Sequence, residues 1–178
     1  MPRQAAGERA AGADGRDVAG SGKGRRAANA TLEKAGTMSV EDTTRALFDR
    51  WERVWHDGAF DLIPSCVAPT YIRHDSLGDR PVTPESYAGE LAKVRADRPG
   101  IRVAAYDHAF KGNRAWYRFE FRWTDPQSGQ PRTQAGMQSY RIEDGKLAET
   151  WISLLAVGSS WPDPVAQETW TSPPPMPT

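Results

Sequence analysis

In the second half of the chain, apolar and polar residues alternate with a period of two, and this pattern limits the fold more than any other feature. Runs rich in β-branched and aromatic residues, separated by turn-forming sequences, span 101–110, 114–123, 133–142 and 147–155. Such residues are typical of strands. Asp144-Gly145 separates the last two runs, and an Asp-Gly pair in that place is a strong hairpin signal. The pattern predicts an antiparallel meander.

The run 114–123 indicates how the two faces of this sheet differ. Successive side chains of a strand point to opposite faces. One face therefore carries the aromatic side chains Tyr117, Phe119, Phe121 and Trp123. The other face carries Trp116, Arg118, Glu120 and Arg122.

Helical periodicity replaces this alternation in the first half. Ser39 is placed to cap a helix, and the carboxylates of Glu41 and Asp42 follow in the first turn, where the helix dipole favours them. Gly58 is a good C-terminal stop. Apolar side chains recur at helical spacing between these signals, and they are Val40, Leu47, Trp51, Val54 and Trp55.

Two further helices and one strand are expected before the meander. A short helix is predicted from Phe60 to Val67, and a longer one begins after Thr83 and ends at Pro99-Gly100. Tyr71 to Asp75 alternates like a strand. Helices followed by an antiparallel meander predict the α+β class, with the helices packed on one face of a sheet.

The length of 178 residues fits one domain and is short for two. Residues 1–37 are rich in Ala, Gly and Arg and cannot bury enough apolar surface to offset the entropy of ordering. We expect a disordered leader there, or a translation start at Met38. The domain is expected over 38–160, followed by a proline-rich tail, 161–178, that is extended or loose.

Composition argues against several functions. Lys plus Arg and Asp plus Glu are both 23, which disfavours a general electrostatic attraction to nucleic acid or acidic membranes. No apolar run approaches the roughly 20 residues that a membrane-spanning helix needs. Cys66 is the single cysteine and there are three histidines, so an internal disulfide is excluded and a structural zinc site is disfavoured. We expect a cytoplasmic protein without metal or cofactor.

His74 and Asp75 are the candidates for proton transfer. Because adjacent residues of an extended run point to opposite faces, only one of them can readily enter a given cavity. An aromatic pocket would raise the pKa of Asp75 toward that of a useful base through desolvation. The alternative is that Asp75 caps the turn at Ser76-Leu77-Gly78. His74 titrates near neutrality and is the rival base, or else a surface residue.

Two strings in this chain resemble one protein family. YIRHDSLG at 71–78 and SYRIEDGKLAETW at 139–151 occur within an order of elements similar to that of the SnoaL-like polyketide cyclases, of the nuclear transport factor 2-like superfamily. The resemblance covers about residues 39–160. It implies a curved antiparallel sheet wrapped around a conical pocket closed by helices, usually in a homodimer. The superfamily hosts isomerases, cyclases, dehydratases, epoxide hydrolases and non-enzymatic binders, so the fold alone does not give the reaction.

The resemblance also implies site residues. In the ketosteroid isomerase branch a general-base Asp follows the second helix, and Asp75 stands at the matching position. The oxyanion hole of that branch combines a Tyr with a protonated Asp, and these positions fall on Trp51 and Gln138. The acid of the SnoaL-like cyclases also falls on Gln138. A glutamine cannot exchange a proton, but its amide N–H can donate to a substrate oxygen.

A second branch implies a different reaction. Limonene-type epoxide hydrolases use an Arg and an Asp two positions apart on a strand, with a second Asp after the tryptophan of the last strand. The corresponding residues here are Arg118, Glu120 and Ser153. Two of the three keep suitable chemistry, so epoxide hydrolysis or epoxide-opening cyclisation is an alternative.

Our hypothesis from the sequence is cofactor-independent acid–base chemistry, such as cyclisation, isomerisation or dehydration, on a small apolar oxygenated molecule resembling a polyketide. Asp75 or His74 would move the proton, and Gln138 would hydrogen-bond to the oxygen that gains charge. The residues expected to contact the substrate are Tyr71, Trp51, Trp55, Arg118, Glu120, Tyr140 and Trp151. A non-catalytic small-molecule binding or interaction domain is the other alternative, because the acid at 138 and the Tyr at 51 are missing.

Overall fold

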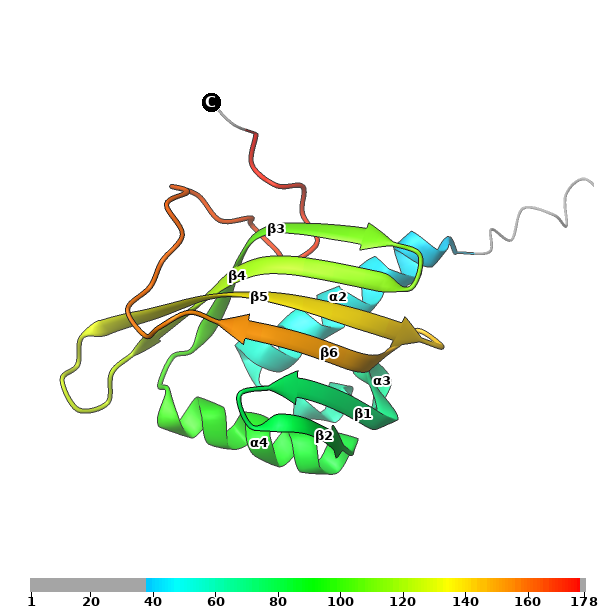
Figure 1. Ribbon diagram of the computed structural model, residues 1–178, viewed down its shortest axis with the longest axis horizontal. Coiled ribbons are helices and arrows are strands. Elements are labelled where there is room, and N and C mark those ends of the chain that lie inside the picture. The colour runs from blue at the N-terminus through cyan, green and yellow to red at the C-terminus, as the bar shows by residue number, and fades with distance from the viewer. Residues whose placement is uncertain (1–37, 177–178) are drawn as a thin grey trace, which may run out of the picture. The chain divides into compact units, whose positions relative to one another are not determined.

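The computed structural model describes residues 38–176 (Figure 1). The expected leader, 1–37, lies outside the described residues. The helical elements are, in chain order, α2 (Val40–Asp57), the 3₁₀ turn η1 (Phe60–Leu62), α3 (Ile63–Cys66) and α4 (Pro84–Asp97). Among the described residues, no helix is both long and apolar enough to cross a membrane.

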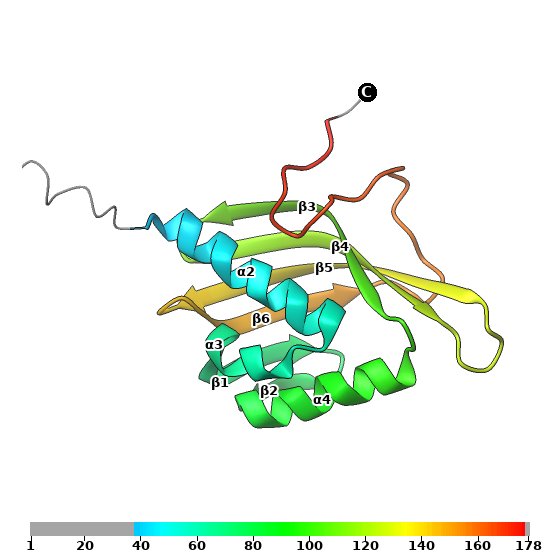
Figure 2. The ribbon, with the colours of Figure 1, turned by 180° about the vertical axis from the view of Figure 1, so that it is seen from behind.

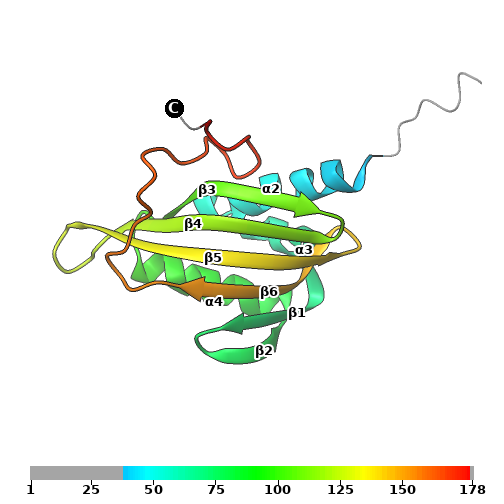
Figure 3. The same ribbon diagram turned by 45° about the horizontal axis from the view of Figure 1, so that its top comes forward.

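Within residues 38–176, six strands form one sheet in the order β2-β1-β6-β5-β4-β3 (Figure 3). The strands are β1 (Val67–Asp75), β2 (Gly78–Val82), β3 (Arg102–Lys111), β4 (Arg114–Thr124), β5 (Pro131–Glu143) and β6 (Lys146–Leu154). All these neighbours are antiparallel except β1 and β6, which run parallel. The α+β class is confirmed, but the sheet is mixed and unclosed rather than wholly antiparallel.

The sequence located most of these elements. The four predicted late strands match β3 to β6 within two residues at each end. Strand β2 was missed, because its sequence Gly-Asp-Arg-Pro-Val holds residues that are depleted in strands. It pairs with β1 at the sheet edge, where proline is tolerated.

Helix α2 begins and ends at the predicted signals. The Ser39 hydroxyl accepts a hydrogen bond from the Asp42 N–H at 3.0 Å, and the Asp42 carboxylate accepts from the Ser39 N–H, which completes a capping box. Gly58 ends the helix with a φ of 71°, in the left-handed region that favours glycine. The buried face of α2 consists of Thr44, Leu47, Phe48, Trp51 and Val54.

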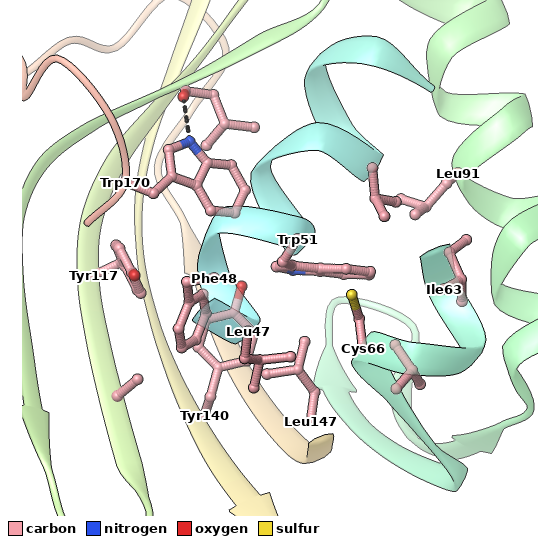
Figure 4. Packing of buried hydrophobic residues seen from close by; sticks show 14 of the residues in the cluster. Leu47, Phe48, Trp51, Ile63, Cys66, Leu91, Tyr117, Tyr140, Leu147 and Trp170 are labelled. Atoms are coloured by element: carbon pink, nitrogen blue, oxygen red, sulfur yellow. Dashed lines mark hydrogen bonds between the residues drawn. The ribbon is translucent and has the colours of Figure 1, made fainter. Parts of the chain in front are cut away.

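The helices cover one face of the sheet, which we call the inner face (Figure 2). Tyr117, Phe119 and Phe121 of β4 are 3–6% exposed there, as their alternation predicts. Phe48 of α2 packs against Tyr117 with ring centroids 4.9 Å apart. The core around Trp51 is drawn in Figure 4. The opposite side of the sheet is its outer face.

The tail departs from expectation. Residues after Leu154 form no helix or strand within the described part, yet Trp170 is only 5% exposed. Its indole Nε1 donates to the Val103 carbonyl at 2.9 Å (Figure 4), and its backbone N–H donates to Glu52 of α2 at 3.1 Å. The many prolines indicate correctly that the tail has no helix or strand, but they do not indicate whether it packs against the domain. The buried Trp170 side chain and hydrogen bonds of Gln167 and Thr171 hold this segment against α2 and β3.

Candidate active site

A cavity of about 600 Å³ opens between α4 and the sheet. Its wall combines aromatic, charged and amide side chains from α2, β1, β2, α4, β4, β5 and β6. The residues on which the chemistry depends are Trp55, Arg73, Asp75, Tyr87, Arg98 and Gln138. A cavity of this size accommodates a small organic molecule.

Strand pairing decides which member of the His74–Asp75 pair faces this cavity. Arg73 lies opposite Thr150 of β6, which is fully buried, so Arg73 and Asp75 point to the inner face. His74 lies opposite Trp151 and stacks on it, with centroids 4.8 Å apart and ring planes 6° apart. Asp75 lines the cavity, and His74 is on the outer face.

Asp75 is held by several donors. Its Oδ2 accepts from Arg73 Nε at 3.1 Å and from Arg80 Nη2 at 3.3 Å, while Oδ1 accepts from the Leu77 N–H at 2.9 Å. Burial by itself would raise the pKa of Asp75, but the Leu77 N–H and the two guanidinium groups bring it below its ordinary value. The expected rise in pKa is therefore wrong, and the turn-capping contact is present.

Tyr87 adds a hydroxyl that the sequence analysis did not select. Arg73 Nη1 donates to the Tyr87 oxygen at 2.5 Å, and the guanidinium lies 4.6 Å from the ring centroid. Burial raises the pKa of Tyr87, so the phenol keeps its proton at neutral pH. Because the oxygen already accepts from Arg73, the Tyr87 O–H can donate to a ligand. Arg73 thus links the Asp75 carboxylate to this hydroxyl.

Gln138 is oriented by its neighbours. The Thr150 hydroxyl donates to the Ser139 carbonyl at 3.0 Å, so its oxygen is left to accept from Gln138 Nε2 at 2.8 Å. This assigns the amide nitrogen to that side. The second N–H of the amide remains available in the cavity, because a side-chain amide carries two donors.

The cavity narrows inward to a space of only about 20 Å³, which shares Trp55 and Gln138 with the larger one. Tyr117, Tyr140 and Trp170 help to line this inner space. Trp170 comes from the tail, so the deep end of the predicted conical pocket is largely filled by the protein itself.

Several predicted substrate contacts do not reach the cavity. Arg118 is on the outer face and pairs with Asp107, at 2.6 Å, and with Asp163. Glu120, 2% exposed, pairs there with Arg122 Nε at 2.6 Å. Trp151 is also on the outer face, beneath His74. These side chains lie outside the cavity because strand alternation places them on the face opposite the buried aromatic side chains.

Two other expected contacts are core residues. Trp51 is 1% and Tyr71 0% exposed, and neither lines the large or the inner cavity. Both rings pack against Tyr87, with centroids 5.8 and 5.5 Å away. They support the wall behind the site, while Trp55 and Tyr140 do line it, in the large and the inner cavity respectively.

Comparison with known proteins identifies the family. The family model of the SnoaL-like domain matches residues 48–150, more than half of the chain. The chain belongs to the SnoaL-like family. A search of curated proteins found no match.

Solved structures share the SnoaL-like fold at low sequence identity. A SnoaL-like polyketide cyclase from Agrobacterium tumefaciens is 22% identical with a TM-score of 0.55, over 67% of this chain and 93% of that one. An NTF2-like protein from Anabaena variabilis is 12% identical with a TM-score of 0.57, over 69% and 98%. Both agree with the nuclear transport factor 2-like architecture.

Asp75 and Gln138 line the same cavity of this SnoaL-like chain. These are the two residues that the resemblance matched to the general base and to an oxyanion-hole position. The residues that sequence reasoning missed are Arg73, Tyr87 and Arg98. Arg73 carried a usable signal, because it is two positions before Asp75 on a strand and so shares its face. Tyr87 lies in the first turns of the helix predicted after Thr83.

Proposed function

We propose that the protein is a cofactor-independent acid–base enzyme of the cyclase or isomerase type, acting on a small apolar oxygenated molecule in the 600 Å³ cavity. The observation that carries this proposal is the placement of a carboxylate, a phenol and an amide, from Asp75, Tyr87 and Gln138, around one cavity. The polyketide cyclase name among the fold relatives supports a polyketide-like substrate.

The reaction starts with proton abstraction. The Asp75 carboxylate takes a proton from a carbon next to a substrate carbonyl, and the Tyr87 O–H and a Gln138 N–H donate to the oxygen that becomes an enolate. The enolate carbon then attacks a second carbonyl, whose oxygen takes the proton back from Asp75 as the ring closes, or Asp75 returns the proton to another carbon, giving an isomer. Trp55 and Phe121 exclude water from this step.

The low pKa of Asp75 limits the substrate. A weak base removes a proton efficiently only from an acidic carbon, and two flanking carbonyl groups provide that acidity. Polyketides carry such 1,3-dicarbonyl units, so the environment of Asp75 and this substrate class agree.

The test is turnover of 1,3-dicarbonyl polyketide analogues by the wild type, Asp75→Asn, Tyr87→Phe and His74→Ala. A general base contributes about 10²–10⁴-fold, so Asp75→Asn should lose that much in kcat. His74→Ala is the matched control, because His74 lies on the outer face, and it should retain activity. Full activity in Asp75→Asn would remove the proposed base.

The same site supports a non-catalytic binding domain as a second candidate. The observation in its favour is that both oxygens of Asp75 are already engaged by Arg73, Arg80 and Leu77. In that case Asp75→Asn binds the ligand with unchanged affinity, and a broad substrate screen gives no product with the wild type. The epoxide hydrolase alternative is not proposed, because Arg118 and Glu120 lie outside the cavity.

We further propose a homodimer through the outer face and a cytoplasmic location. Trp116 and Met137 are 42% and 57% exposed there and line a shallow groove with Trp151. Met137→Asp should convert a dimer into a monomer in solution scattering, and a monomeric mass for the wild type would refute the dimer. Cell fractionation tests the location.

A further inference from the structure

In the part of the chain that the structure describes, three arginines and three carboxylates line the cavity, but their ion pairs leave one arginine without an acidic partner. The lining residues with charged side chains are Arg73, Asp75, Arg80, Glu90, Asp97 and Arg98. Arg73 and Arg80 both bind Asp75, and Arg80 also forms a two-pronged pair with Glu90, with N–O distances of 2.6 and 2.8 Å.

Asp97 is paired away from the cavity. Its Oδ2 accepts from Nζ of the exposed Lys93 at 2.6 Å. Each carboxylate of the wall therefore already has a cationic partner. Arg98 is the remaining cation, and within residues 38–176 it has no ion pair and donates no side-chain hydrogen bond.

Arg98 is positioned by aromatic rings. It follows α4, and its guanidinium carbon lies 4.6 Å from the Trp123 ring centroid and 5.8 Å from that of Phe121. Burial lowers the pKa of Arg98, and only the neighbouring Asp97 acts against that. A guanidinium held over a ring keeps its N–H donors at the edge of its plane, where a planar anion can meet them.

We propose that Arg98 is the specificity residue of this cavity and that the substrate carries one carboxylate on an apolar body. A carboxylate matches the guanidinium fork in shape. A single uncommitted cation fits one negative charge better than a phosphate of higher charge. Trp55 and Phe121 beside Arg98 provide the apolar wall. This inference rests on the proposed function only in taking the cavity as the substrate site.

The experiment compares two probes of nearly equal shape, 2-naphthoate and neutral 2-naphthamide. Binding to the full chain is followed by NMR titration at neutral pH and low salt. A charge-assisted bidentate contact predicts at least about tenfold tighter binding of naphthoate by the wild type. Arg98→Gln should bring the two affinities together, and Arg98→Lys should keep part of the preference.

Arg53→Gln is the matched control, since Arg53 is an exposed arginine of α2 outside the cavity lining. It should keep the full preference. Thermal unfolding checks that Arg98→Gln is folded, which is expected because Arg98 makes no ion pair. Equal affinities in the wild type, a preference that survives Arg98→Gln, or no binding of either probe at millimolar concentration would overturn the proposal.

Turnover separates this inference from the proposed function. A naphthoate preference that depends on Arg98, together with no product from any dicarbonyl, would keep the anion site and remove the enzyme. Turnover of neutral substrates, with no preference for the naphthoate anion, would keep the enzyme and remove the anion site.

Discussion

Replacing Trp170 by Ala tests whether the tail is docked as a unit. The indole is 5% exposed and fills space at the inner end of the site. If the surrounding chain were rigid, Trp170→Ala would leave a void and cost about 3–5 kcal/mol, as for other buried Trp residues. A terminal segment has another option, because it can detach.

The magnitude follows from the contacts of the tail. Burying the indole, roughly 200 Å² at about 25 cal/mol per Å², contributes about 5 kcal/mol. Six hydrogen bonds dock the tail and contribute about 1 kcal/mol each. They join Trp170 Nε1 to Val103, Trp170 N to Glu52, Gln167 N to Ala105, the Gln167 side chain to His108, Thr171 Oγ1 to Asp49, and Arg45 to the Thr171 carbonyl. Ordering residues 167–172 costs about 6–9 kcal/mol.

Docking is therefore favourable by only about 2–5 kcal/mol, and without the indole and its hydrogen bond it becomes unfavourable. We expect Trp170→Ala to release the tail. The decrease in unfolding free energy should then be the same for Trp170→Ala as for a variant that lacks residues 165–178. Urea unfolding of both variants measures this, with Met176→Ala, 85% exposed, as the control without effect. A glutamate-specific protease should also cleave after Glu168 faster in Trp170→Ala.

Two results would refute this reasoning. One is a deletion of 165–178 that leaves the unfolding free energy unchanged. The other is a Trp170→Ala variant whose unfolding free energy falls clearly more than that of the deletion. A tail that can detach limits the cost of the substitution to the free energy of docking, and such a result would exceed that limit.

The remaining predictions concern packing, histidine titration and pH dependence. Gly136→Ala should cost about 1–3 kcal/mol in urea unfolding, because the added Cβ would lie 3.0 Å from the Ser153 carbonyl and nearer still to two side chains. Gly89→Ala in α4, with open space around it, should instead stabilise by about 0.5–1 kcal/mol, and the opposite order would contradict the packing. In an NMR titration His56 should have a pKa below 6.5, because burial disfavours its charge, and His74 a pKa above 6.5, because two carboxylates bind its ring. His56 makes the unfolding free energy fall as pH drops below 6.5, because the unfolded state binds the proton more readily. His74 makes it fall as pH rises through the raised pKa, because the folded state then loses the bound proton. A reversed order of the two pKa values would refute both environments. For the proposed reaction, the acid limb of kcat/KM should lie below pH 3.8, since the pKa of Asp75 is lowered, and a limb between pH 5 and 7 would assign the base elsewhere.

Local sequence determined most elements of this protein, with strand β2 as the exception. Capping at Ser39, the glycine stop at Gly58 and the Asp-Gly hairpin act over a few residues, so they can be read directly. The period of two also determined that Arg118 and Glu120 lie opposite the aromatic face of β4. Assigning them to the pocket by resemblance ignored that constraint.

Tertiary structure decided the site. Alternation shows that His74 and Asp75 face opposite ways, but only the pairing of β1 with β6, distant in sequence, decides which one is inside. The pKa of Asp75 is lowered by the Leu77 N–H, by Arg73 of the same strand and by Arg80 of the paired strand β2, whereas the sequence analysis considered only desolvation for that pKa. Trp170 likewise binds a surface built by α2 and β3, and no local pattern in a proline-rich tail encodes such a contact. The local periodicity determines the face to which each side chain points. Residues that are distant in sequence determine which groups that side chain contacts.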